Sequence, residues 1–220
     1  MDGTRSIRDE LRVLPVFSVP SPSLDYGDLP DSPTELFRDW LDTAIATGIP
    51  EPHAMTLSTV DPDGAPDARV LILKDQIRES WYFASSAASA KGRHLQDDRR
   101  AALTFYWPGI GRQVRIRGLV ERRDEAASGS DFLARGLGAR AVALASNESA
   151  PLGDRSECVA AVSDARERLA VDPNLVAAHW ALYSLTADQV EFWQADPNRM
   201  HHRIQYSRPH GDWVRSLLWP

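Results

Sequence analysis

Five short runs of sequence decide the fold of this chain: AMTLSTVD (54–61), DARVLILK (67–74), SWYFASS (80–86), AALTFYW (101–107) and RQVRIRGLVE (112–121). Each run is rich in β-branched or aromatic residues, and turn signals such as Asp61-Pro62-Asp63-Gly64 separate them. Spacings of hairpin length favour an antiparallel meander or barrel over a parallel sheet. The runs therefore predict the strands of one antiparallel sheet.

Helical and then further strand patterns follow these runs. Apolar residues recur at helical spacing near 124–135, 139–146 and 153–170. The strand pattern resumes with HWALYSL (179–185), QVEFWQA (189–195), RMHHRIQY (199–206) and WVRSLLWP (213–220). We therefore predict a mainly β fold with flanking helices (α+β).

The N-terminal region is expected to divide from the rest at residue 32. Prolines recur in residues 1–32, which predicts an extended arm, and residues 33–220 then form a single domain. Ser32 or Asp31 can cap a helix that has Pro33 at its first position. The buried stripe of this helix is expected to contain Leu36, Phe37, Trp40, Leu41 and Ala44.

Composition argues against several classes of protein. The chain has 220 residues and a formal net charge of −6, whereas binding to the nucleic-acid backbone needs a basic surface. Cys158 is the single cysteine, so neither a disulfide framework nor a thiolate metal cluster is expected. No apolar run reaches the roughly 18 residues of a membrane span, and the charged N-terminus lacks the apolar region of a secretory signal. We expect a cytoplasmic protein with no nucleic-acid or membrane partner.

The segment EFWQADPNRMHHR, Glu191 to Arg203, has the strongest indication of a ligand site. A turn signal at Asp196-Pro197-Asn198 separates two expected strands. On the second strand, the period of two places Arg199, His201 and Arg203 on one face. Three positively chargeable groups are costly to bury together unless an anion or an electron-rich ligand faces them. This face therefore predicts one wall of a ligand site.

The segment SSAASAKGRHL, Ser85 to Leu95, runs from a strand end into an expected short helix. Ser89 is placed to cap this helix, and Lys91 falls in its first turn. Free amide groups, serine hydroxyls and a lysine together suit a phosphate group. The alternative is a capped helix with a solvated lysine, and the segment by itself leaves both open.

Two further strands carry candidate polar residues. Gln113 shares a face with Arg115 and Arg117, which is either a solvated arginine face or the rim of a site where the glutamine binds a polar heterocycle. Arg69 and Lys74 lie five residues apart and so on opposite faces of a regular strand. Either a bulge lets both reach one ligand, or they are the snorkelling ends of a buried strand.

The histidines do not suggest a metal site. His201 and His202 are adjacent and should point to opposite strand faces, and no carboxylate or cysteine has the spacing to complete a coordination shell. The chain also lacks the G-x-S-x-G motif of a Ser-His-Asp hydrolase. We therefore expect no bound metal.

Taken together, eight segments resemble the pyridoxamine 5′-phosphate oxidase family. They are EPHAMTLSTVD, RVLILK, S-x-KG, FYW, RQVRIRG, ASNES, EFWQ and R-M-H-H-R, in the order and spacing of that family, and the resemblance runs from about Phe37 to Pro220. It implies an antiparallel FMN-binding split β-barrel. It also implies a homodimer with two FMN sites at the subunit interface.

The resemblance assigns roles to residues of this chain. It implies FMN-phosphate contacts for Arg69, Ser89 and Lys91, with Ser85 close by. It places Gln113 and Trp193 against the flavin ring system, and Arg203 and Ser149 among the other FMN contacts. The residues implied to face the substrate are Lys74, Arg135, Arg199 and His201, the last two over the reacting carbon.

Three positions depart from the family pattern. Asp131 replaces a tyrosine that contacts the substrate phosphate, and Ala139 replaces a phosphate-binding serine. Glu148 replaces a glutamine beside the flavin site. A carboxylate repels a phosphate dianion, and a lost hydroxyl removes about 1 kcal/mol of hydrogen bonding. The FMN site is thus better kept than the substrate site.

The resemblance leaves three functional hypotheses. The first is an FMN-dependent oxidase that converts pyridoxamine or pyridoxine 5′-phosphate to pyridoxal 5′-phosphate, with O2 as electron acceptor and H2O2 as product. The second is an FMN-dependent oxidase of a reduced tricyclic intermediate, as in relatives from phenazine biosynthesis. Asp131 and Ala139 favour the second, whereas Lys74 and Arg135 favour the first. The third is a flavin-binding module without turnover.

Overall fold

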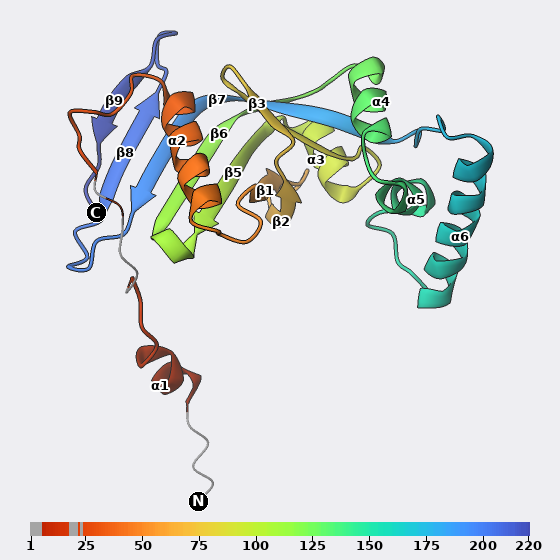
Figure 1. The fold of residues 1–220 in the computed structure, drawn as a ribbon, viewed down its shortest axis with the longest axis horizontal. Coiled ribbons are helices and arrows are strands. Elements are labelled where there is room, and N and C mark those ends of the chain that lie inside the picture. The colour runs from red at the N-terminus through yellow and green to blue at the C-terminus, as the bar shows by residue number, and fades with distance from the viewer. Residues whose placement is uncertain (1–5, 18–21, 23) are drawn as a thin grey trace, which may run out of the picture.

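The computed structural model describes residues 6–17, 22 and 24–220. In this part of the chain, nine strands form one antiparallel sheet in the order β2-β1-β5-β6-β7-β4-β3, with β8 on β7 and β9 on β8. Their bounds are β1 Ala54–Val60, β2 Pro66–Ile72, β3 Asp75–Ile77, β4 Ser80–Ser86, β5 Arg100–Trp107, β6 Arg112–Arg122, β7 Trp180–Gln194, β8 His202–Ser207 and β9 Val214–Leu217. The sheet curls, with helices around it (Figure 1). The predicted mainly β fold with flanking helices is confirmed.

Strand β7 corrects one expectation, because HWALYSL and QVEFWQA belong to one 15-residue strand. Its first half pairs with β4, from Trp180 to Thr186, and its second half pairs with β8, from Gln189 to Gln194. Strand β6 pairs along the other edge of β7, and the register of this pairing shifts between Arg117 and Gly118. The polar residues between the two halves resemble a turn, but partners on both edges keep them extended.

Helix α2, Pro33–Ala46, covers one face of the sheet (Figure 1). Ser32 caps it, with its side chain accepting a hydrogen bond from the amide of Thr34 at 3.3 Å. The predicted buried stripe is confirmed, and its aromatic members make edge contacts with the sheet. The ring of Phe37 lies 5.1 Å from that of Phe105, and the ring of Trp40 lies 5.1 Å from that of Phe192.

Helices α4 Glu125–Leu133, α5 Leu137–Ala145 and α6 Arg155–Val171 confirm the three helical patterns. They lie at the end of the sheet that is farther from β8 and β9 (Figure 1). Helices α5 and α6 pack through a small apolar cluster of Ala141, Ala165 and Leu169. The 3-10 turn η1, Pro108–Ile110, joins β5 to β6.

The N-terminal arm is not wholly extended, which corrects the expectation for residues 1–32. Residues Ile7–Arg12 form helix α1, because Ser6 caps it and acidic residues in its first turn suit the helix dipole. The end of the arm is hydrogen-bonded to the last strands. The hydroxyl of Tyr206 donates to the carbonyl of Pro30 at 2.7 Å, and Arg215 donates to the carbonyl of Leu29 at 2.5 Å.

Two negative findings apply to residues 6–17, 22 and 24–220. No helix there has the length and apolar character that a membrane span requires. The same residues contain no group of three or more histidine, cysteine, aspartate or glutamate side chains arranged to hold a metal ion.

Candidate functional site

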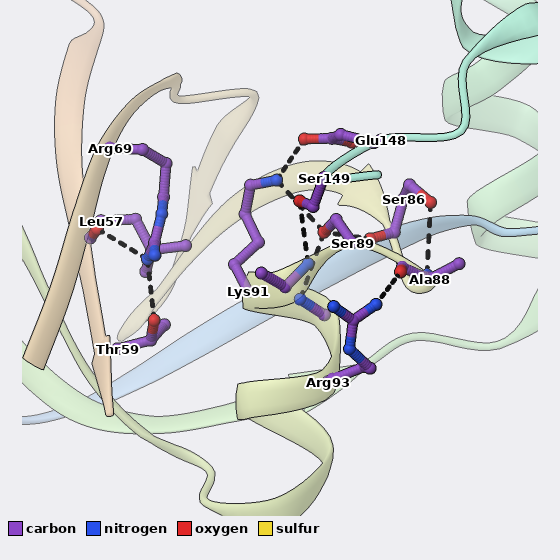
Figure 2. Close-up of polar contacts among 12 residues, drawn as sticks. Leu57, Thr59, Arg69, Ser86, Ala88, Ser89, Lys91, Arg93, Glu148 and Ser149 are labelled. Atoms are coloured by element: carbon purple, nitrogen blue, oxygen red, sulfur yellow. Dashed lines mark hydrogen bonds and ion pairs between the residues drawn. The ribbon is translucent and has the colours of Figure 1, made fainter. Parts of the chain in front are cut away.

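A cluster of polar residues lies near the start of helix α3, Ala90–Asp97. We call it the basic cluster, and it consists of Arg69, Ser89, Lys91, Glu148 and Ser149 (Figure 2). Ser89 caps the helix as predicted, and its hydroxyl oxygen accepts from the amide of Gly92 at 3.2 Å. A Cβ atom on Gly92 would lie 2.4 Å from the carbonyl oxygen of Ala87, so only glycine allows the helix to start this close to the preceding turn.

Lys91 is buried in this cluster, which makes the solvated-lysine alternative wrong. Its side chain is only 7% exposed. The Nζ atom donates to the Ser89 hydroxyl at 3.2 Å and forms an ion pair with the Glu148 carboxylate (Figure 2). Ser149 joins the cluster through its hydroxyl, which accepts from the amide of Ala90 at 3.1 Å. Burial of an ammonium group requires such compensating partners.

Arg69 reaches the same region from the edge strand β2. Its Nη1 atom donates to the Thr59 hydroxyl at 2.7 Å and to the carbonyl of Leu57 at 3.2 Å, and its Nη2 atom pairs with Asp67. The strand is not a buried one, since Val70 is 65% exposed. Lys74 lies beyond the end of β2. Arg69 and Lys74 are thus directed to different neighbours.

Three predicted residues lie in one row across the sheet. Gln113 in β6 pairs with Trp193 in β7, and Trp193 pairs with Arg203 in β8. Directly opposed residues of antiparallel strands point to the same face. An amide, an indole ring and a guanidinium group are therefore presented side by side, as a flat polar ligand requires.

The row lies on the opposite face of the sheet from Arg69. Register links Arg69 to Leu57, Leu57 to Leu103 and Leu103 to Ile116, and these last three side chains are fully buried. Gln113 is three residues before Ile116 in β6, so it points the other way. A single copy of the chain therefore presents Arg69 of the basic cluster and this row on opposite faces of the sheet.

Glu191 holds the row in place, although the sequence analysis gave it no role. Its side chain is 5% exposed and pairs with both Arg115 and Arg203, with an Arg203 Nη2 to carboxylate distance of 3.0 Å. It is two residues from Trp193, so strand parity was a signal that could have identified it. Glu191 fixes the Arg203 guanidinium beside Trp193.

Acid should destabilise the protein partly through Glu191. Although burial alone would raise its pKa, hydrogen bonds from Arg203 and Arg115 hold the pKa of Glu191 below its ordinary value of 4.5. Such a carboxylate stabilises the folded state above the unfolded pKa, and the contribution is lost as the pH falls through the lower, folded pKa. The free energy of unfolding should thus decrease below about pH 4.5, and less steeply in E191Q. Equal slopes in urea titrations at several pH values would contradict this.

The prediction that Arg199 and His201 share a strand face with Arg203 is wrong. Strand β8 begins only at His202, and Arg199 lies in the preceding turn with a φ of 64°. The turn itself was predicted correctly: the amide of Arg199 donates to the carbonyl of Asp196 at 2.9 Å. His201 still lies by the row, because its ring is 4.8 Å from that of Trp193. Arg199 is exposed.

Phe17 is a neighbour of the row that the sequence analysis did not single out. Its ring lies 5.5 Å from the Trp193 ring and 4.7 Å from the His201 ring. An aromatic residue in a proline-containing arm gave no signal of this contact.

Lys74, Asp131, Arg135 and Trp180 form a second charged group, which we call the Asp131 cluster. Lys74 Nζ lies 3.4 Å from the Asp131 carboxylate, whose other oxygen accepts from the Trp180 indole at 2.9 Å. The Arg135 guanidinium lies over the Trp180 ring, 4.0 Å from its centroid. Burial lowers the pKa of Arg135, and the Asp131 charge opposes this shift. One Nη1 atom of Arg135 is buried with no partner among the described residues.

Two predicted positions remain to be located in the structure, Ser85 and Ala139. Ser85 is buried in β4, opposite Ala181 of β7. Ala139 is exposed on α5. Trp180, which holds both Asp131 and Arg135, was missed because a tryptophan at a strand start has the ordinary signature of core packing.

Comparison with known proteins identifies the family. The profile of "Pyridoxamine 5'-phosphate oxidase" matches residues 41–169, and that of "Pyridoxine 5'-phosphate oxidase C-terminal dimerisation region" matches residues 180–220. A pyridoxine/pyridoxamine 5′-phosphate oxidase from Ralstonia pickettii is 42% identical over 90% of this chain and 93% of its own length. One from Pseudomonas paraeruginosa is 40% identical with the same coverage.

Solved structures agree with the sequence comparison. The structure of PhzG from Burkholderia lata 383, in complex with tetrahydrophenazine-1-carboxylic acid, has a TM-score of 0.86 at 30% identity, covering 92% of this chain and 100% of that one. A pyridoxamine 5′-phosphate oxidase-related, FMN-binding protein from Nostoc punctiforme shares the fold, with a TM-score of 0.70 at 19% identity over 87% of this chain and 100% of that one. The two profiles and the relatives above 30% identity show that the chain belongs to the pyridoxamine 5′-phosphate oxidase family.

Proposed function

We propose that the protein is an FMN-dependent oxidase that converts pyridoxamine or pyridoxine 5′-phosphate to pyridoxal 5′-phosphate. The observation that carries this proposal is the buried Lys91 at the start of α3, with the hydroxyl groups of Ser89 and Ser149 beside it. The names of the relatives at 40% and 42% identity support the vitamer substrates.

The described residues fit both the phosphate group and the ring system of FMN. The basic cluster offers an ammonium, a guanidinium, hydroxyl groups and the positive end of a helix, which are the donors a phosphate monoester prefers. The row of Gln113, Trp193 and Arg203 offers an amide, an aromatic ring and a cation to a flat, polar ring system. Arg69, Lys91, Ser89 and Ser149 would hold the phosphate, with Ser85 in the strand that leads to them.

The proposed site needs two copies of the chain. Arg69 of the basic cluster and the row point to opposite faces of one sheet, so a second subunit is the simplest source of the missing half. The match of residues 180–220 to a dimerisation region supports this, because β7 and β8 carry Trp193 and Arg203. We therefore propose a homodimer with FMN bound between the subunits.

The chain's own residues would position the substrate and control charge. FMN, when bound, would supply the redox chemistry, a hydride transfer from the substrate with O2 as electron acceptor and H2O2 as product. His201 lies against Trp193, and its Nδ1 atom accepts from the amide of Asp196 at 3.1 Å, which leaves Nε2 to face a ligand. Arg199, exposed in the adjoining turn, would bind the anionic substrate beside it. Lys74 and Arg135 would bind the substrate phosphate.

Asp131 favours a second candidate substrate. Its carboxylate already neutralises Lys74, so the Asp131 cluster carries one net positive charge rather than two. A ligand with one negative charge, such as a carboxylate, fits this balance better than a phosphate dianion. The PhzG structure holds tetrahydrophenazine-1-carboxylic acid. Our second candidate is therefore an oxidase of a reduced tricyclic carboxylate.

A flavin-reduction experiment separates these functions. Purified protein loaded with FMN should lose its visible absorbance when pyridoxine phosphate or pyridoxamine phosphate is added without oxygen. Bleaching by a reduced phenazine carboxylate, with none by the phosphorylated vitamers, would establish the second candidate instead. A protein that gains no FMN on titration would show that the flavin proposal is wrong.

Removal of the Asp131 charge should improve the binding of a phosphorylated substrate. In D131N, Lys74 and Arg135 no longer share a carboxylate, so the KM for pyridoxine phosphate should fall about ten-fold, which is about 1.4 kcal/mol. The KM for unphosphorylated pyridoxine should not change and serves as the control. Steady-state H2O2 production measures both, and an unchanged KM for the phosphate ester would refute the role of Asp131.

A further inference from the structure

We propose that Glu148 is an internal competitor for the cofactor phosphate: its carboxylate pairs with Lys91, and FMN must displace it to bind. This inference rests on the proposed FMN site and adds a residue that sets its affinity. It starts from the ion pair between Lys91 Nζ and Glu148 Oε1, the one contact in the basic cluster that joins the lysine to an anion (Figure 2).

The burial of the two partners is unequal. The Lys91 side chain is 7% exposed, whereas that of Glu148 is 39% exposed. A buried ammonium group needs a counter-charge, while a carboxylate near solvent can leave at moderate cost because water can solvate it. The lysine is therefore the fixed partner and the glutamate the exchangeable one. A phosphate group would meet the same requirement of Lys91.

The structure also offers Glu148 an alternative position. It lies in the segment between α5 and α6, outside either helix. It lines a cavity of about 390 Å3 whose wall also includes Arg168 of α6 and His179. Burial raises the pKa of the Tyr183 phenol in β7, and the Glu148 charge adds to this shift. A displaced carboxylate can thus turn toward Arg168 without becoming an isolated buried charge.

A neutral side chain at this position would not compete. Glutamine has the same size and could still accept a hydrogen bond from Lys91, but it brings no charge to oppose a phosphate. The effect should depend on the phosphate of the ligand. Riboflavin has the flavin ring and the ribityl chain of FMN without the phosphate, so it reports on the rest of the site.

The test is flavin binding to the full-length wild-type protein and to E148Q, measured by quenching of flavin fluorescence. We expect E148Q to bind FMN about ten-fold more tightly, because FMN then has roughly one charge-assisted contact fewer to displace. We expect its affinity for riboflavin to be unchanged. E157Q removes the same charge from an exposed position in α6 and should match the wild type for both ligands. E148A provides a second variant with the same expected direction, and circular dichroism checks that each variant is folded.

The outcomes distinguish this inference from the proposed function. If the wild type and E148Q both bind FMN with equal affinity, or E148Q binds it more weakly, Glu148 is not a competitor, although the FMN site stands. Equal tightening for FMN and riboflavin would also overturn the inference, because the phosphate would play no part. If neither protein binds FMN, the FMN proposal and this inference both fail.

Discussion

Replacing Lys91 with methionine should weaken FMN binding by ten-fold to about a hundred-fold. Methionine keeps the length and apolar stem of the lysine but removes an ammonium that is only 7% exposed. A hydrogen bond to a charged group contributes about 1.5–3 kcal/mol, and each 1.4 kcal/mol is a factor of ten in affinity. The purified variant should therefore be nearly colourless where the wild type is yellow, and a fluorescence titration should give the ratio of dissociation constants.

The matched control for this experiment is Lys74→Met. Lys74 lies in the Asp131 cluster, and its Nζ atom is 3.4 Å from the Asp131 carboxylate rather than beside Glu148. We expect K74M to retain FMN with wild-type affinity while its KM for a phosphorylated substrate rises. Equal FMN affinity in K91M and the wild type would mean that the basic cluster does not bind the cofactor phosphate.

The second large effect is on stability, in Gly118→Ala. The new Cβ atom would lie 2.0 Å from the carbonyl oxygen of Thr186 and 2.9 Å from the Cα of Ala187, which are backbone atoms of β7. Overpacking in a rigid interior costs about 1–3 kcal/mol, and a clash with backbone should reach at least the upper end of this range. Because the β6–β7 register shifts at this glycine, relief of the clash also disturbs the pairing that aligns Gln113 with Trp193.

A glycine-to-alanine substitution inside a helix should instead increase the stability of the protein. Gly129 lies inside α4, and a Cβ atom there has no neighbour within 4 Å among the described atoms. G129A should stabilise the protein by about 0.5–1 kcal/mol, since alanine favours the helical backbone. Chemical denaturation of the two variants measures both effects. A G118A variant as stable as the wild type would show that β7 moves freely away from β6.

Much of the fold could be predicted from the sequence because its elements have strong local signals. The hairpin spacing of the five strand runs, the capped helix after Ser32 and the three later helical patterns are confirmed. Strand β7 could not be predicted as one element, because its continuity depends on β4, β6 and β8 pairing along it. Helix α1 was missed because the prolines around it dominate the pattern.

The sequence suggested candidate site residues but not their arrangement, and it assigned no role to Phe17, Glu191 or Trp180. Period-two alternation was enough to place Gln113 on one face with Arg115 and Arg117, since strand geometry fixes parity. It failed for Arg199, because a turn with a left-handed residue precedes β8 and ends the alternation. Parity is reliable only as far as the strand extends.

What the sequence alone determined is therefore which residues are present and in what order: the antiparallel strand runs, the caps, the family motifs and the three departures at Asp131, Ala139 and Glu148. The tertiary structure alone decided which charges meet. Glu148 pairs with Lys91 and Asp131 with Lys74, across separations of 57 residues in each case. The physical reason is range. Backbone preferences act within a few residues, whereas an ion pair depends on distance in space, which is fixed only when the sheet curls and the helices dock against it.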